Sequence, residues 1–132
     1  VELFEGQKAI FTLFTNLISG AKPNELYLVF SINEENKTDQ ANLFFKNLAV
    51  RRKEKKLDTR LLKNTKYYIK EKNTRLKLKY TNFNLPQGIT IFRDYVILLS
   101  WIDSPIAIKI ESETFANQQK IFFLDLWKTT KQ

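Results

Sequence analysis

The chain has 132 residues, a formal net charge of +8 and neither cysteine nor histidine. Disulfide and thiolate chemistry are therefore excluded, as are Ser-His-Asp hydrolysis, histidine metal sites and histidine general bases. Eleven Phe, five Tyr and two Trp supply the core of one domain of this length. We expect residues 1–132 to form a single domain, excised from a longer protein because the sequence lacks an initiator methionine.

The positive charge is concentrated in one segment. Residues 46–80 hold fourteen Lys and Arg against three Asp and Glu, whereas the remainder holds eight basic and eleven acidic residues. No window approaches the roughly 18 apolar residues of a membrane span, and the N-terminus lacks a secretory signal pattern. We therefore expect a cytoplasmic domain without a membrane partner.

The first half of the chain alternates helical and strand patterns. Amphipathic spacing indicates helices, and short apolar runs between them indicate strands. In chain order we predict a helix at Glu5–Ser19, a strand at Glu25–Ile32, a polar loop at Asn33–Thr38, a helix at Asp39–Lys56 and a strand at Leu57–Leu62. The tail of the second helix, RRKEKK, is expected to be solvated.

The segment Lys63–Phe83 has the weakest pattern. It fits one helical turn around Tyr67–Glu71 and a strand at Arg75–Tyr80. Pro86 ends this segment, and a run of strands follows.

Three successive strands are predicted at Gly88–Phe92, Tyr95–Ile102 and Ile106–Ile110, with tight turns between them. The middle one is apolar at nearly every position, which requires cover on both faces, so it should lie at the centre of a sheet with helices above and below. The third alternates isoleucine with Ala107 and Lys109. It therefore has one buried face and belongs nearer the sheet edge.

A final helix is predicted at Ser112–Lys131, with Ser112 as its N-cap. An apolar stripe of period near 3.6 should pack this helix across the sheet. The stripe consists of Phe115, Ala116, Phe122, Phe123, Leu126 and Trp127. The fold class is therefore α/β, with a central mixed sheet flanked by helices, its early strands parallel and its late strands antiparallel.

The basic segment 46–80 admits two interpretations. It could track nucleic-acid phosphates, with Tyr67, Tyr68 and Tyr80 stacking on bases. The phosphate contacts would come from Arg51, Arg52, Lys53, Lys55 and Lys56. The alternative is a solvated helix end and a lysine-rich surface, which we favour because the sequence carries no recognition helix or glycine-rich RNA motif.

A small-molecule site is the other possibility. Ser31 and Asn33 follow the first strand and Lys63 follows the second, so all three should meet at one end of the sheet. Trp101 ends the central strand as either a pocket wall or, more simply, a core aromatic.

We identify no pair of carboxylates suited to acid–base catalysis. Asp94 and Asp103 read as turn residues, and Asp58 lies beside a strand. The chain has no glycine-rich phosphate loop either. We therefore predict no catalytic residue, metal or cofactor.

Five stretches, taken in order, resemble the regulatory domain of TrmB-type transcriptional regulators. They are EGQKAIFTLFTNLISGAKPNELYLVFS, LAVRRKEKKLDTRLL, ITIFRDYVILLSW, PIAIKIES and FANQQKIFFLDLWK. The resemblance implies a phospholipase D-like fold and a role in effector sensing or dimerisation. It also implies a homodimer that binds DNA through a winged helix outside this sequence, and it allows a small-molecule effector. Sugar sensing belongs to a further domain of that family and is not carried over.

The same resemblance allows a test for catalysis. Phospholipase D-like enzymes carry a His-x-Lys-x4-Asp signature, in which the histidine is the nucleophile and the lysine holds phosphate. If Asp94 is set on its aspartate, Gln87 and Ile89 occupy the histidine and lysine positions. Neither side chain can replace its counterpart. The resemblance therefore implies a non-catalytic domain, with a nucleic-acid-binding module as the alternative.

Overall fold

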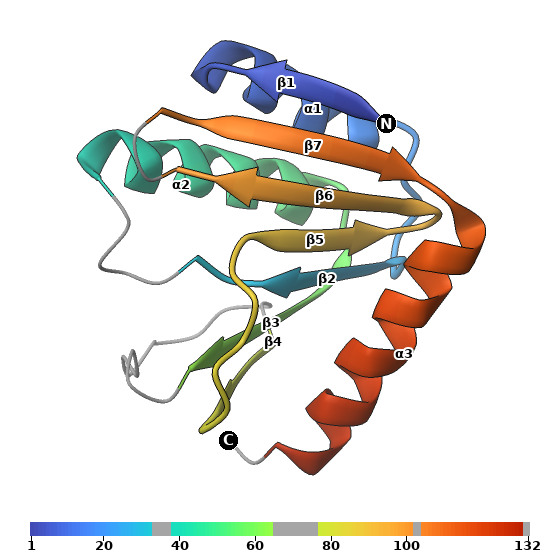
Figure 1. Cartoon of the computed structure of the whole chain (residues 1–132). Helices are drawn as coiled ribbons and strands as arrows, with labels where there is room; N and C mark the ends of the chain where they lie inside the picture. The colour runs from blue at the N-terminus through green and yellow to red at the C-terminus, as the bar shows by residue number, and fades with distance from the viewer. Residues whose placement is uncertain (33–37, 65–76, 102–103, 131–132) are drawn as a thin grey trace.

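The computed structural model describes residues 1–32, 38–64, 77–101 and 104–130. Within these ranges a seven-stranded sheet has the order β1-β7-β6-β5-β2-β3-β4, with α1 and α2 on one face and α3 on the other (Figure 1). In chain order the elements are β1 (Glu2–Glu5), α1 (Gln7–Leu17), β2 (Leu26–Phe30), α2 (Asp39–Glu54), β3 (Asp58–Asn64), β4 (Lys77–Thr81), β5 (Ile89–Phe92), β6 (Tyr95–Ser100), β7 (Ile106–Glu111) and α3 (Glu113–Thr129).

The sheet is mixed, as predicted. β2, β3 and β4 are mutually parallel, and every other pairing is antiparallel. β6 lies inside the sheet with helices on both faces, which explains its unbroken apolar run. Two residues, Arg93 and Asp94, connect β5 to β6 as the predicted tight turn.

The N-terminus differs from the prediction. Glu5 ends a short edge strand, β1, and the first helix begins only at Gln7. Gly6 makes the corner with a φ of 89° and donates its N–H to Pro105 O at 3.0 Å. Four residues are too few to show a strand period, and β1 exists because β7 offers it a partner.

β7 is less one-sided than its alternating pattern predicts. Ala107 is fully buried against the α1 and α2 side, whereas Ile106, Ile108 and Ile110 are only half-buried. A small side chain lies under the helices because α1 packs close to this strand. The isoleucines occupy the opposite face. On that face α3 packs against β5 and β6 rather than against β7.

Ser112 caps α3 as predicted, its Oγ accepting the Phe115 N–H at 3.1 Å. Phe123 and Trp127 pack into the core on this side of the sheet. Phe122, by contrast, is 52% exposed although its ring lies 6.0 Å from that of Phe30. The predicted stripe is therefore wider than the face that the sheet covers.

The weakly patterned segment contains the predicted strand. β4 covers Lys77–Thr81 beside β3, which runs on to Asn64 and so includes Lys63. The predicted turn at Tyr67–Glu71 and the start of the strand at Arg75 lie outside the described residues, as does Asp103.

An ion pair ties the β5–β6 turn to the residues before β2. Arg93 donates from Nε to Glu25 Oε2 at 2.8 Å and from Nη2 to Glu25 Oε1 at 2.6 Å. Nη2 also donates to Gly20 O at 3.0 Å. The Arg93 bonds, with a further bond from the Lys22 N–H, lower the pKa of Glu25 to about 2.

This pair predicts a component of acid sensitivity. A carboxyl group whose folded pKa lies below its unfolded value stabilises the fold above pH 4.5, and that stabilisation is lost as the pH falls from 4.5 toward 2. Glu25→Gln should lower the stability at pH 7 by no more than about 1 kcal/mol, because the pair is partly exposed. The fall in Tm between pH 5 and pH 2.5 should then be smaller than in the parent chain.

The matched control is Glu54→Gln, which removes a surface carboxylate 3.6 Å from Arg51. Thermal melts of the three proteins at both pH values measure the difference. An acid-induced fall in Tm that is the same in Glu25→Gln as in the parent would contradict the role assigned to this pair.

Candidate ligand site

Three of the four predicted ligand residues lie at one end of the sheet. β2 runs parallel to β3 and in the same direction as β6, so the ends that carry Ser31, Lys63 and Trp101 coincide. Ser31 continues β2 by donating its N–H to Leu62 O at 3.2 Å. Asn33, the fourth, lies outside the described residues.

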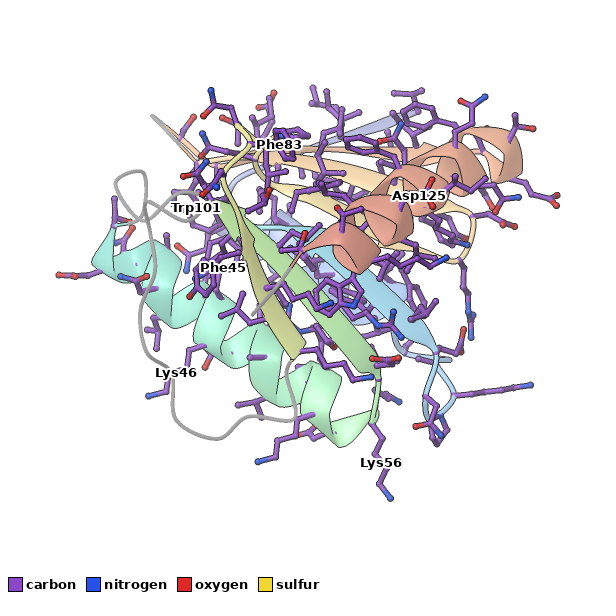
Figure 2. The ribbon with its side chains drawn as sticks, turned by 90° about the horizontal axis from the view of Figure 1, so that it is seen from below. Phe45, Lys46, Lys56, Phe83, Trp101 and Asp125 are labelled. Carbon is purple, nitrogen blue, oxygen red and sulfur yellow. The ribbon has the colours of Figure 1, made fainter. Side chains whose placement is uncertain are left out.

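Trp101 is a core aromatic. It is 6% exposed, and its ring centroid lies 4.7 Å from that of Phe44 and 5.6 Å from that of Phe45, both on α2. Figure 2 shows Trp101 and Phe45 near each other between α2 and the sheet. Trp101 therefore helps to hold α2 against the sheet and does not line the cavity described next.

A cavity of about 90 Å³ lies between α2 and the sheet face formed by β2, β3 and β5. Apolar side chains make most of its wall, including Val29, Leu48, Leu61 and Leu99. The polar residues of the lining are Tyr27, Ser31, Arg52 and Thr90. Of the three predicted ligand residues that the structure describes, Ser31 is thus the one that lines it.

Ser31 carries an unusual hydroxyl. Its Oγ is buried, and no hydrogen-bond partner lies near it among the described residues. A buried hydroxyl without a partner costs about 1 to 3 kcal/mol, so native proteins rarely leave one unless a ligand or water can reach it. The cavity beside Ser31 supplies such a space.

Arg52 lines the cavity and is only partly exposed to solvent. Its guanidinium lies 5.3 Å from the centre of the Tyr27 ring and also bonds the Tyr27 hydroxyl. The prediction that the whole RRKEKK tail is solvated is therefore wrong for this residue. Arg52 stands four positions after Leu48 and eight after Phe44, so it continues the buried face of α2.

Tyr27 is deeply buried beneath Arg52. Burial raises the pKa of the Tyr27 phenol, and the neighbouring Arg52 and Thr90 oppose that rise in part. The hydroxyl is consequently a neutral hydrogen-bonding group in the ordinary pH range. This side of the cavity offers donors and a positive charge, and the described part of its lining contains no carboxylate.

The other basic residues proposed for nucleic-acid contact lie around the end of α2. Arg51 pairs with Glu54 at 3.6 Å, and the Lys55 ammonium donates to Ser19 O at 2.9 Å. Lys53 and Lys56 are exposed, and Figure 2 shows Lys46 and Lys56 extending away from the sheet. Some of these basic residues therefore make contacts within the fold, and the others extend into solvent.

The three residues that the resemblance sets on the phospholipase D signature have different surroundings. Gln87 is exposed, Ile89 packs against the core on the α3 side, and Asp94 is exposed in the β5–β6 turn. Between them Gly88 donates its N–H to Phe30 O at 2.9 Å and accepts the Leu99 N–H at 2.8 Å. This stretch joins β2 to β6.

The described residues lack two further features. No group of three or more Asp, Glu, Cys or His side chains is placed there to hold a metal ion. Among the helices in the described part of the chain, none is long and apolar enough to cross a membrane.

No family model and no curated protein matches the sequence. Solved structures do match it. TrmBL2, an archaeal chromatin protein with a novel mode of DNA binding, is similar with a TM-score of 0.61 and 11% identity over 98% of this chain and 52% of that chain. NucT from Helicobacter pylori has a TM-score of 0.62 and 13% identity over 98% of this chain and 96% of that chain. Nuc, a phospholipase D family member from Salmonella typhimurium, has a TM-score of 0.59 and 12% identity over 98% of this chain and 96% of that chain.

At these identities the similarity establishes the fold, and the predicted phospholipase D-like fold is confirmed. The chain spans about half the length of the TrmBL2 chain. It spans nearly the whole of the two other structures.

Proposed function

We propose that this chain is a non-catalytic regulatory domain of a DNA-associated protein of the TrmB-like class. The observation that carries the proposal is a phospholipase D-like fold in a chain with no histidine in its 132 residues. Gln87 stands at the position of the nucleophile, and the partly buried Ile89 stands where the signature places a cation. Neither residue supports covalent phosphoryl transfer.

The likeness to TrmBL2 supports the DNA-related part of this proposal, because that protein binds DNA and has the same fold over half of its length. NucT and Nuc are equally similar in fold, and Nuc is a phospholipase D family member, so fold alone does not separate regulator from enzyme. The residues at the signature positions favour the regulator.

A regulatory domain acts by favouring one arrangement of its protein over another. Effector binding and self-association are the two routes we propose, and either one works only if it stabilises one arrangement more than the other. Ile121 and Phe122 present exposed apolar side chains on α3, which supports self-association through a homodimer. We place the domain in the cytoplasm with its DNA.

A turnover assay tests the absence of catalysis. The chain is incubated with bis(4-nitrophenyl) phosphate and with plasmid DNA, and we expect product at the rate of the buffer alone. Gln87→Ala is the matched control, because it removes the side chain at the nucleophile position without entering the core. Hydrolysis by the parent chain that is lost in Gln87→Ala would falsify the non-catalytic assignment.

Direct DNA contact by the basic segment 46–80 is the second candidate, favoured by the exposed Lys46, Lys53 and Lys56. Fluorescence anisotropy of labelled DNA with the isolated chain between 50 and 200 mM salt distinguishes it. Contacts to several phosphates predict an affinity that falls steeply with salt, by about tenfold or more over this range. For the regulatory domain we expect weak binding with a shallow dependence.

A further inference from the structure

The cavity beneath α2 combines three properties that rarely occur together without a ligand. It has an apolar wall, a buried hydroxyl without a partner on Ser31, and a guanidinium at its edge on Arg52. We propose that it binds a small organic monocarboxylate, with its hydrocarbon part against the wall and its carboxylate on Arg52. The role of this ligand as the effector rests on the proposed regulatory function.

The charge of the ligand follows from the side chains present. Arg52 has no carboxylate within ion-pair distance among the described residues, although it stacks over Tyr27. A guanidinium has five N–H donors, and stacking and one bond to a hydroxyl leave several of them for a planar carboxylate. Among the described residues, no acidic side chain lines the cavity to repel an anion. A cationic ligand would be repelled by Arg52 and would find no carboxylate among the described lining residues.

The hydrocarbon part follows from the wall. Val29, Leu48 and Leu61 approach the space from β2, α2 and β3, and Phe14 closes it from α1. An engineered protein cavity of about 150 Å³ accepts benzene. The present volume of about 90 Å³ therefore suits a short or branched aliphatic chain and is too small for an aromatic ring.

The position of the cavity connects it to the rest of the domain. Its wall includes residues of α1 and α2 together with β2, β3 and β5 and the Gly88 junction. An occupant would contact both the helical layer and the sheet, so binding would favour the arrangement in which α2 is seated on the sheet. The site lies on the α1 and α2 face, whereas Ile89 of the signature packs on the α3 face.

Isobutyrate is the probe for this site. Titration into the isolated chain at constant ionic strength, with sodium chloride as the reference salt, should raise Tm with ligand concentration, because a ligand of the folded state stabilises it. Isobutyramide has the same shape without the charge and should bind at least tenfold more weakly. Benzoate, which carries the charge on a larger body, should also bind at least tenfold more weakly.

Two variants assign the contacts. Arg52→Gln should remove the preference for isobutyrate over isobutyramide, whereas the control Arg51→Gln, on the exposed side of the same helix, should leave it unchanged. Ser31→Ala should raise Tm without ligand, since it removes an unsatisfied buried hydroxyl. Ligand-observed NMR gives the affinities independently of stability.

The proposal is overturned if isobutyrate at 50 mM changes neither Tm nor the NMR spectrum relative to chloride. It is also overturned if Arg52→Gln binds isobutyrate as well as Arg51→Gln does. These outcomes leave the regulatory function standing, because that proposal is tested by phosphodiester turnover. Binding together with turnover would keep the site and reject the regulatory function.

Discussion

Gly88→Ala is expected to be the most destabilising of the three glycine-to-alanine substitutions in the chain. Gly88 has a φ of 69°, and a Cβ built there would lie 2.2 Å from the Leu99 carbonyl oxygen. That oxygen belongs to the backbone of β6 and cannot turn aside as a side chain can. We expect a loss of about 3 to 4 kcal/mol, of which about 1 kcal/mol is the left-handed conformation itself.

The other two glycines separate the cost of the backbone conformation from the cost of the steric clash. Gly6 has a φ of 89° with nothing within 4 Å of the added Cβ, and Gly20 meets nothing within 4 Å either. Gly6→Ala should therefore cost only the conformational term, which is about 2 kcal/mol because a φ of 89° with a ψ of 152° is a region that essentially only glycine adopts. Gly20→Ala should be close to neutral. Urea unfolding of the three variants measures all of these free energies.

A Gly88→Ala chain as stable as Gly6→Ala would mean that β6 yields to the methyl group and that the junction is loose. The expected large loss would instead establish a rigid contact between Gly88 and β6. Gly88 also lines the cavity, so the variant is predicted to weaken isobutyrate binding.

Much of the fold can be predicted from the sequence because the patterns of β2, β5, β6 and both long helices are local. A continuous apolar run on β6 and helical spacing on α2 each need only a few neighbouring residues to be recognised. β1, by contrast, forms by pairing with β7, which lies far along the chain. Propensity cannot show that Ala107 lies under a helix, because the answer depends on how closely α1 approaches.

The candidate site is predictable only in part for a similar reason. The position of Ser31 at the end of a buried strand indicates the correct end of the sheet. The run of basic residues around Arg52 predicts a solvated position, although the spacing of Arg52 from Phe44 and Leu48 indicates the buried face of the helix. A cavity has no sequence pattern at all, since it is space left between α2 and three strands that pair at long range.

Phe44→Ala is predicted to have the largest effect among core truncations on the α1 and α2 face of the sheet. Phe44 is 2% exposed, and its ring lies 5.7 Å from Phe11, 5.2 Å from Phe45 and 4.7 Å from Trp101. These rings join α1, α2 and the end of β6 in one cluster. Truncation removes the central ring and leaves a cavity, so we expect a loss of about 3 to 5 kcal/mol and a fall in Tm of roughly 10 °C or more.

Leu43→Ala is the matched control, one position earlier on the same helix and 58% exposed. Its effect should stay within about 0.5 kcal/mol, because exposed substitutions that keep the helix intact change little. Thermal and urea unfolding of both variants give the comparison. A loss from Phe44→Ala no larger than that from Leu43→Ala would mean that α2 is not anchored by this cluster. The cavity beneath α2 would then lack the rigid roof that the isobutyrate site requires.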